Sequence, residues 1–287
     1  MLNLKQSYSK CIEIFKKNYR KEFIGLYIFK YDKFKHICAF YSFIKVINDI
    51  INNQTTLLDK KVILFDLETI FFTVLNEYQR SQERTVFLTT FIKKEYDVFF
   101  EIFPALIHTN EKYDIGKHNL QSIFTSMRMD LDQNRYQNFS ELEQYLSGTG
   151  EVFSEFLYLL MENKDNSFDI LDYIYGLGKG FQFSNILLNI KNDFKKNPIK
   201  IYIPLDEQNE YDCNLELEIP RIINNSIPNN NMKKLVKYQV ERSKKYYEYS
   251  QQGVDRIDKE YNEIVNGYVK IYSNFNEKII QNNYDLN

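Results

Sequence analysis

Four polar residues in segment 178–193 (GKGFQFSNILLNIKND) are spaced to lie on one face of an α-helix. Gln182, Asn185, Asn189 and Asp193 follow one another at intervals of three, four and four residues. Side chains at these intervals stack along the same side of a helix. Their amide and carboxylate oxygens are the ligand types that hard cations prefer. The spacing therefore predicts a helix face that holds divalent cations and a polyanion.

A second segment, 40–52 (FYSFIKVINDIIN), carries a similar polar cluster. Asn48, Asp49 and Asn52 follow one another within about one helical turn. Aromatic residues surround both clusters, so we expect two helix faces that line one cavity. Only Asp49 and Asp193 among these side chains carry a charge, which limits the attraction that either face offers to a cation.

The elements that would position these residues are nearly all helices. A capping box at Asn138–Ser140 with Glu143 is expected to open the sixth of them. Strand-like alternation is confined to 200–203 and 214–219. Helical periodicity predicts helices at residues 3–18, 33–53, 57–80, 84–108, 117–135, 140–162, 168–196, 231–251 and 254–282.

Domain boundaries are hard to find along this chain. Four of its five prolines fall in window 197–231, which is too long for an ordinary connection between helices. No internal repeat or shift in composition divides the rest. The sequence predicts a single all-α domain, residues 1–287, folded as a helical bundle around a central apolar cavity.

The gross composition excludes several classes of function. The 287 residues have a formal net charge of −2, so no overall basic surface points to nucleic acid. Three widely spaced cysteines are typical of free thiols in a reducing compartment. No signal peptide and no run of about 18 apolar residues is found. We expect a cytoplasmic protein, with a peripheral membrane contact left open.

Five segments, in their order along the chain, resemble the squalene/phytoene synthase family. The likeness spans almost the whole chain, and the order of the segments is that of the family. Segments 39–52 and 178–193 stand where the family has its two aspartate-rich motifs. The others are 127–139 (MRMDLDQNRYQNF) with Tyr145, 201–207 (IYIPLDE) and 253–285.

This resemblance implies a bundle of helices around a deep apolar cavity. Family members ionise an allylic diphosphate with bound Mg²⁺ and join two isoprenoids head to head. The departing diphosphate needs cations to neutralise its growing charge. The carbocation left behind needs an aromatic wall that excludes water.

The resemblance also implies roles for individual residues. The catalytic candidates are Tyr41, Asp49, Tyr145 and Asp193, where the two tyrosines would line the cation pocket. The substrate-binding candidates are Lys45, Asp130, Gln182 and Asn185. The metal-binding candidates are Asn48, Asp49, Asn52, Asn185, Asn189 and Asp193.

Several positions depart from the family pattern. Asn48 and Asn52 replace the outer aspartates of the first motif, and Asn189 replaces the first aspartate of the second. Lys45 stands where arginine is usual, which removes a bidentate fork. In the stretch 147–151 (SGTGE), the alanine–glycine pair of the family is shifted, and a glutamate, Glu151, is introduced. Fewer carboxylates predict weaker binding of Mg²⁺.

Three functions follow as hypotheses. The first is a prenyltransferase that acts on farnesyl or geranylgeranyl diphosphate with Mg²⁺, or with Mn²⁺ in its place. The second is a catalytically impaired homologue that acts as a binding or assembly protein. The third is a class I terpene cyclase, because Asn185, Asn189 and Asp193 resemble the neutral-plus-acidic metal triad of that class. The sequence leaves open the substrate's chain length, a reductive step with NADPH and the oligomeric state.

Overall fold

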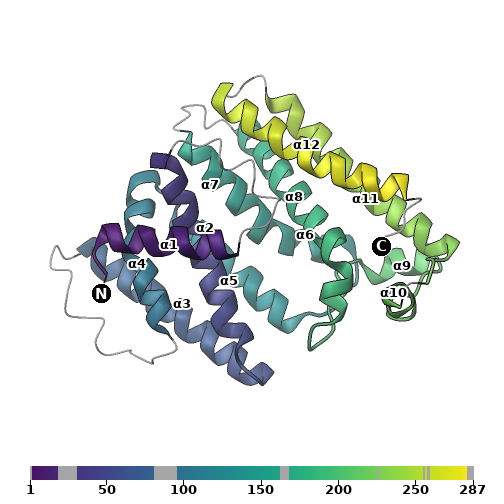
Figure 1. Cartoon of the computed structure of the whole chain (residues 1–287), viewed down its shortest axis with the longest axis horizontal. Coiled ribbons are helices and arrows are strands. Elements are labelled where there is room, and N and C mark those ends of the chain that lie inside the picture. Colours follow the sequence, from purple (N-terminus) through teal and green to yellow (C-terminus); the bar gives the residue numbers. More distant parts are fainter. Residues whose placement is uncertain are drawn as a thin grey trace. The chain divides into compact units, whose positions relative to one another are not determined.

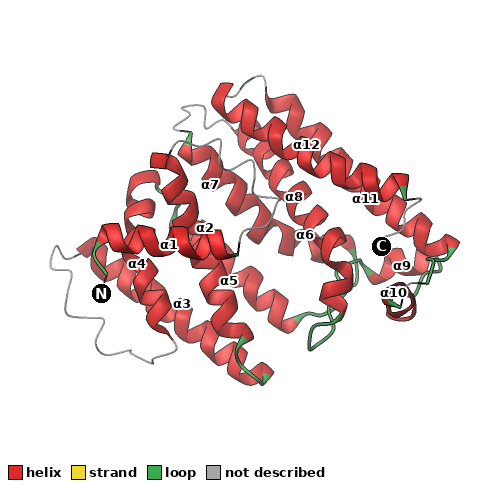
Figure 2. Ribbon diagram, viewed as in Figure 1, coloured by secondary structure: helices red, strands yellow, loops and turns green. Residues whose placement is uncertain are grey.

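Every regular element in the part of the chain that the computed structural model describes is a helix (Figure 2). The described residues are 2–18, 31–80, 96–161, 168–224, 226–254, 256 and 259–282. Residues 255, 257, 258 and 283–285 of the family-like segment 253–285 lie outside them. The predicted all-α class is confirmed.

The helices form two compact units, Met1–Leu131 and Asp132–Asn287, which are described separately (Figure 1). That residues 1–287 form one domain stays a prediction. The first unit contains α1 (Leu4–Lys17), α2 (Tyr31–Asn52), α3 (Leu57–Arg80), α4 (Asp97–Tyr113) and most of α5 (Lys117–Asp132).

The core of the first unit is largely aromatic. Phe43 of α2 lies 4.8 Å, centroid to centroid, from Phe71 of α3 and 5.7 Å from Phe124 of α5. Phe99 and Phe103 of α4 extend this cluster, and all five rings are at most 1% exposed. Many of the aromatic side chains in this unit therefore pack in its core.

The second unit is built around α8 (Phe168–Phe194), which packs against segments from both sides of it in the sequence. The remaining elements are α6 (Phe139–Leu146), a π-helical turn η4 (Ser147–Glu151), α7 (Val152–Leu160), α9 (Leu205–Glu210), α10 (Leu215–Ile223), α11 (Asn230–Val254) and α12 (Lys259–Gln281). Figure 1 shows α11 and α12 running alongside each other.

The structure corrects several predicted boundaries. The predicted helix 140–162 is three segments, because η4 interrupts it at 147–151. Its N-cap is Asn138, whose side chain accepts from the Glu141 amide at 3.0 Å, so the expected role of Ser140 and Glu143 is wrong. The predicted helix 84–108 corresponds to α4. Its residues 84–95 lie outside the described residues, and α4 extends beyond the predicted end to Tyr113.

The proline-containing window 197–231 is more than a connection between helices. It contains α9 and α10, and α10 begins directly after its cap, Asn214. The expectation of a strand at 214–219 is therefore wrong, because helix capping overrides the short apolar alternation there. Strand-like pairing is limited to a single bridge between Arg135 and Ile201 among the described residues.

Candidate active site

The first predicted patch lies at the C-terminal end of α2, and its polar side chains are exposed. Asn48, Asp49 and Asn52 all face solvent. Lys45, one turn earlier, forms an ion pair with the Asp49 carboxylate. The structure thus brings together a predicted phosphate-binding lysine and the only carboxylate of this patch.

Tyr41 stands one turn before Lys45 on α2 and is half-buried. Its ring lies edge-on to Phe15 of α1, at 5.1 Å between centroids. Asp130 is partly exposed on α5 of the same unit. Both residues lie on helices, as the helical periodicity predicted. That they contact a substrate stays a prediction.

The second patch lies along α8, where the three amide side chains are partly exposed and Asp193 is only 6% exposed. The Asn189 side-chain nitrogen donates to the backbone carbonyl of Asn185 at 2.8 Å. This bond turns the amide nitrogen toward the helix backbone, so the oxygen is the group that Asn189 offers outward.

Asp193 lies among lysines at the end of α8. The Lys196 ammonium contacts its carboxylate at 2.7 Å. Its backbone carbonyl accepts from the amide of Lys200 at 3.0 Å. Lys200 is itself only 6% exposed, and its ammonium donates to the Gln133 carbonyl at 2.9 Å.

Lys200 was missed by the sequence reasoning. It directly precedes the segment 201–207 that carries part of the family likeness, and a lysine before an apolar strand-like run was the available signal. Burial of a lysine is rare unless its charge is balanced. The charged cluster at this helix end consists of the Asp193–Lys196 ion pair and the buried Lys200, which meets Asp193 through its backbone amide. The spacing of the asparagines did not reveal it.

Two of the family-like segments pair with each other although about 65 residues separate them. The Ile201 amide donates to the Asn134 carbonyl at 3.2 Å, and the Leu205 amide donates to the Tyr136 carbonyl at 2.9 Å. This pairing stacks three tyrosines. Tyr202 lies 5.3 Å from Tyr145 and 5.9 Å from Tyr136, centroid to centroid.

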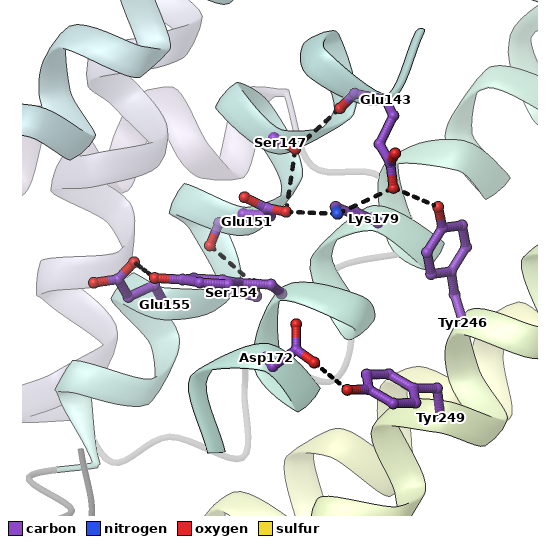
Figure 3. A network of polar contacts seen from close by, with 10 residues as sticks. Glu143, Ser147, Glu151, Ser154, Glu155, Asp172, Lys179, Tyr246 and Tyr249 are labelled. Carbon is purple, nitrogen blue, oxygen red and sulfur yellow. Dashed lines mark hydrogen bonds and ion pairs between the residues drawn. The ribbon is translucent and has the colours of Figure 1, made fainter. Parts of the chain in front are cut away.

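A polar network surrounds Lys179, one turn before Gln182 on α8 (Figure 3). Its ammonium contacts Glu151 at 3.0 Å and Glu143 at 3.2 Å, and the Tyr246 hydroxyl donates to Glu143 at 3.3 Å. Burial lowers the pKa of Lys179, but the hydrogen bonds and charges of the two glutamates outweigh it and raise that pKa. Glu151, the unexpected acidic residue of segment 147–151, is therefore held by a lysine of α8.

The oxygen atoms of the two patches are of the kind that hard cations prefer, but few of them carry a negative charge. Each patch offers amide oxygens and one carboxylate, and both carboxylates contact lysines. Among the described residues, no group of three or more histidine, cysteine, aspartate or glutamate side chains is arranged to hold a metal ion. That the two patches face each other stays a prediction, because α2 and α8 belong to different compact units.

The chain is similar to known phytoene synthases. A family model described as squalene/phytoene synthase matches residues 15–287. The chloroplastic phytoene synthase 1 of Zea mays is 22% identical over 286 residues, 98% of this chain and 63% of that protein. The 15-cis-phytoene synthase of Synechocystis sp. is 23% identical over 192 residues, 63% of this chain and 55% of that protein. The chain thus spans less than two thirds of the length of these relatives.

Solved structures share the fold. The squalene synthase HpnC from Alicyclobacillus acidocaldarius matches with a TM-score of 0.79 at 13% identity, over 98% of this chain and 96% of that one. A dehydrosqualene synthase solved in complex with a ligand matches with a TM-score of 0.76 at 17% identity, over 99% and 89%. At such identities the likeness confirms the isoprenoid-synthase type of helical fold. Since the family model covers nearly all of the sequence, the chain belongs to the squalene/phytoene synthase family.

Proposed function

We propose that the protein is a Mg²⁺-dependent prenyltransferase that joins two allylic isoprenoid diphosphates, farnesyl or geranylgeranyl diphosphate, head to head. Diphosphate and a squalene- or phytoene-type hydrocarbon would be the products. Membership of the family and the charged cluster of Asp193, Lys196 and Lys200 support this proposal. The cluster carries it, because a buried carboxylate paired with a lysine at a helix end offers both a ligand for a metal and a cation for a phosphate oxygen.

The lysines would bind the substrate's phosphate oxygens. Lys196 and Lys200 lie within one short stretch after α8. Lys196 would exchange its contact with Asp193 for one with a phosphate oxygen, and the Lys200 ammonium would leave the Gln133 carbonyl to do the same. Gln182, Asn185 and Asp130 would steady the rest of the substrate. On α2, Lys45 would exchange its contact with Asp49 for one with a phosphate oxygen.

Mg²⁺, or Mn²⁺, would neutralise charge on the departing diphosphate. Asp49, Asn48 and Asn52 would hold it on α2, and Asp193, Asn189 and Asn185 on α8. Because these six side chains include two carboxylates, the substrate's own oxygens would complete the coordination. Metal binding and substrate binding should therefore depend strongly on each other.

The stacked tyrosines would protect the cation that diphosphate departure leaves. Tyr145 and Tyr202 stack on each other, and the negative quadrupole of an aromatic face stabilises positive charge. Tyr41 would contribute a further ring. Close stacking also excludes water, which would otherwise capture the cation.

A catalytically impaired homologue is the second candidate. The contact of Lys45 with Asp49 and the three asparagines at aspartate positions favour it, since both reduce the negative charge available to a metal. Such a protein would bind isoprenoid diphosphates, or assemble with a partner, without turnover.

The purified chain, incubated with either diphosphate and a range of Mg²⁺ or Mn²⁺ concentrations, tests the proposal. We expect release of diphosphate and a linear head-to-head hydrocarbon, measured by a phosphate assay and by mass spectrometry. Asp193→Asn should lower kcat at least about a hundredfold, because it removes one of two carboxylates. Asp172→Asn is the matched control on α8, where it only accepts from Tyr249.

Each other outcome has a defined meaning. No turnover with either substrate, together with tight binding of a diphosphate analogue, would replace the enzyme with the impaired homologue. A cyclic product formed from one substrate molecule would identify a terpene cyclase on the same scaffold. Equal losses of kcat in the Asp193 and Asp172 variants would show that Asp193 has no specific role in the active site.

A further inference from the structure

The first three turns of α3 expose large apolar side chains. Leu58 is 72% exposed and Phe65 67%, while Val62 and Leu57 are 48% and 42% exposed. Isolated exposed apolar residues are common on protein surfaces, but contiguous ones mark interaction sites. We call Leu58, Val62 and Phe65 the α3 stripe.

The helical geometry makes the stripe continuous. Its members are spaced by four and three residues, so they stack on one side of α3. The opposite side of the same helix is already buried, through Leu67 at 0% and Phe71 at 1% exposure. The core therefore does not use the stripe, and α3 is apolar on two faces.

Acidic groups near the stripe have partners within the protein. Asp59 accepts from the Thr56 hydroxyl at 2.6 Å at the start of the helix. Asp66 accepts from the Tyr96 hydroxyl at 3.3 Å. Glu68 forms an ion pair with Arg128 of α5. Of these contacts, the pair with Arg128 offsets a full charge, which reduces the repulsion that an approaching anionic surface would meet beside Glu68.

Basic groups lie along one flank of the stripe. Lys61 is exposed and directly precedes Val62, whereas Lys60 falls on the side of α3 that carries Leu67. On the flank toward α5, the Lys117 ammonium lies 5.7 Å from the centroid of the Phe72 ring. Lysines at the edge of an apolar face keep their charge at the level of lipid headgroups while their stems lie on apolar surface.

We propose that the α3 stripe binds the surface of an anionic lipid bilayer. Phe65, Val62 and Leu58 would enter the boundary between headgroups and acyl chains, and Lys61 and Lys117 would contact phosphate groups. Such binding grows with buried apolar area and with attraction between lysines and anionic lipids. Among the described residues, no helix is long and apolar enough to cross a membrane, so this contact lies on the surface of the bilayer. The proposal goes beyond the catalytic function and does not depend on it.

Co-sedimentation of the full chain with vesicles tests this surface. We use phosphatidylcholine vesicles with and without phosphatidylglycerol, at low and physiological ionic strength. The wild-type chain should bind the anionic vesicles more tightly, and added salt should weaken that binding. Phe65→Asp should weaken binding at least about tenfold, because it removes an inserted ring and adds a charge that anionic lipid repels.

Matched controls separate the stripe from general surface effects. Leu217→Asp changes a residue of α10 that is 65% exposed and should leave vesicle binding unchanged. Lys61→Glu with Lys117→Glu should weaken binding to anionic vesicles at least about 25-fold, at about fivefold per lysine lost. The adjacent pair Lys233→Glu with Lys234→Glu of α11 should have little effect. Circular dichroism should show the same helix content in all variants, since the changed side chains lie outside the core.

Three results would overturn the proposal. The first is equal binding of the Phe65 and Leu217 variants to anionic vesicles. The second is binding that does not distinguish anionic from neutral lipid. The third is a wild-type dimer in lipid-free solution that Phe65→Asp converts to a monomer, which would assign the stripe to a second copy of the chain.

Discussion

Asn189 has a structural role in α8 besides its predicted role in metal binding. Its side-chain nitrogen donates to the Asn185 carbonyl, a bond that an aspartate at this position cannot make. An ionised carboxylate would instead face a carbonyl oxygen. The replacement of the family's aspartate by Asn189 therefore removes charge and adds a hydrogen bond within the helix.

We predict that Asn189→Asp lowers the free energy of unfolding by about 1–2 kcal/mol without metal. Added Mg²⁺ should recover part of this loss, because the new carboxylate raises the affinity of the α8 face for the ion. Urea unfolding with and without Mg²⁺ measures both effects. Asn192→Asp, on an exposed position of the same helix, should stay within about 0.5 kcal/mol of the wild type. A variant at 189 as stable as this control would contradict the prediction.

Two histidines that the sequence places 72 residues apart lie together in the first unit. The rings of His36 and His108 stack at 5.6 Å, and the Tyr8 hydroxyl lies 2.9 Å and 2.8 Å from their Nδ1 atoms. Thr109 donates to the Ala105 carbonyl, so its oxygen accepts from Nδ1–H of His36 at 2.8 Å. With that proton on Nδ1 of His36, the Tyr8 hydroxyl donates to Nδ1 of His108.

We predict that this cluster makes the fold sensitive to acid. Burial, then the charges of Lys112 and Lys35, lower the pKa of His36 to about 3, against the smaller opposing charge of Asp32. Between pH 6.5 and pH 3 the unfolded state binds more protons than the folded state. The free energy of unfolding therefore falls as the pH drops through this window, by up to about 1.4 kcal/mol per unit.

Denaturant unfolding between pH 3 and pH 7 measures this dependence. His36→Gln should flatten the acid limb of the stability curve, because glutamine does not titrate. His118→Gln changes an exposed histidine and should leave the limb unchanged. If the His36 and His118 variants had the same slope, other groups would account for the acid sensitivity.

At the scale of elements, α8 and η4 cross with their backbones in contact. A Cβ atom added at Gly178 would lie 2.2 Å from the backbone oxygen of Gly150, and one at Gly150 would lie 2.3 Å from that of Gly178. Neither backbone can yield without moving a helix. This crossing sets the position of Gln182, whose Cβ lies 3.2 Å from the position of an added Gly150 Cβ.

We predict that Gly178→Ala destabilises the protein by about 3 kcal/mol or more, although alanine favours a helix by about 1 kcal/mol. Gly176→Ala in the same helix is the control, since its Cβ would meet side-chain atoms of Tyr249 and Ser250 at 3.0 Å and 3.1 Å. Those side chains can shift, so the change should be within about 1 kcal/mol. Urea unfolding of both variants gives the comparison, and similar losses would show that the backbone crossing is not tight.

At the scale of the whole molecule, the low charge of the predicted metal site couples metal to substrate. We predict that neither Mg²⁺ nor a non-hydrolysable isoprenoid diphosphate analogue alone raises Tm appreciably, whereas both together do. At a concentration 100 times its Kd, a ligand stabilises the folded state by about 2.7 kcal/mol, which corresponds to about 5–10 °C. Differential scanning calorimetry measures these shifts. A full shift with Mg²⁺ alone would mean that the protein provides a complete metal site.

Local features of the fold were predictable because they depend on near neighbours. The helical face of Gln182, Asn185 and Asn189 follows from 3.6-residue periodicity, and the structure contains it in α8. The π-helical turn 147–151 was not predictable from such periodicity, because it accompanies the contact of Gly150 with a helix 28 residues later. The start of α10 was mispredicted for a different reason, because its cap at Asn214 is a local signal that competes with a strand-like alternation in the same residues.

The sequence by itself determined the all-α class, the polar helix faces and, through its ordered segments, the family. Tertiary structure alone decided which distant groups meet and which stay exposed. It paired Lys179 with Glu143 and Glu151, joined the Lys200 amide to the Asp193 carbonyl, stacked His36 on His108 and left Phe65 in solvent. The physical reason is the range of the interactions. Helix periodicity is encoded within four residues, whereas these contacts join or expose positions through the packing of whole helices.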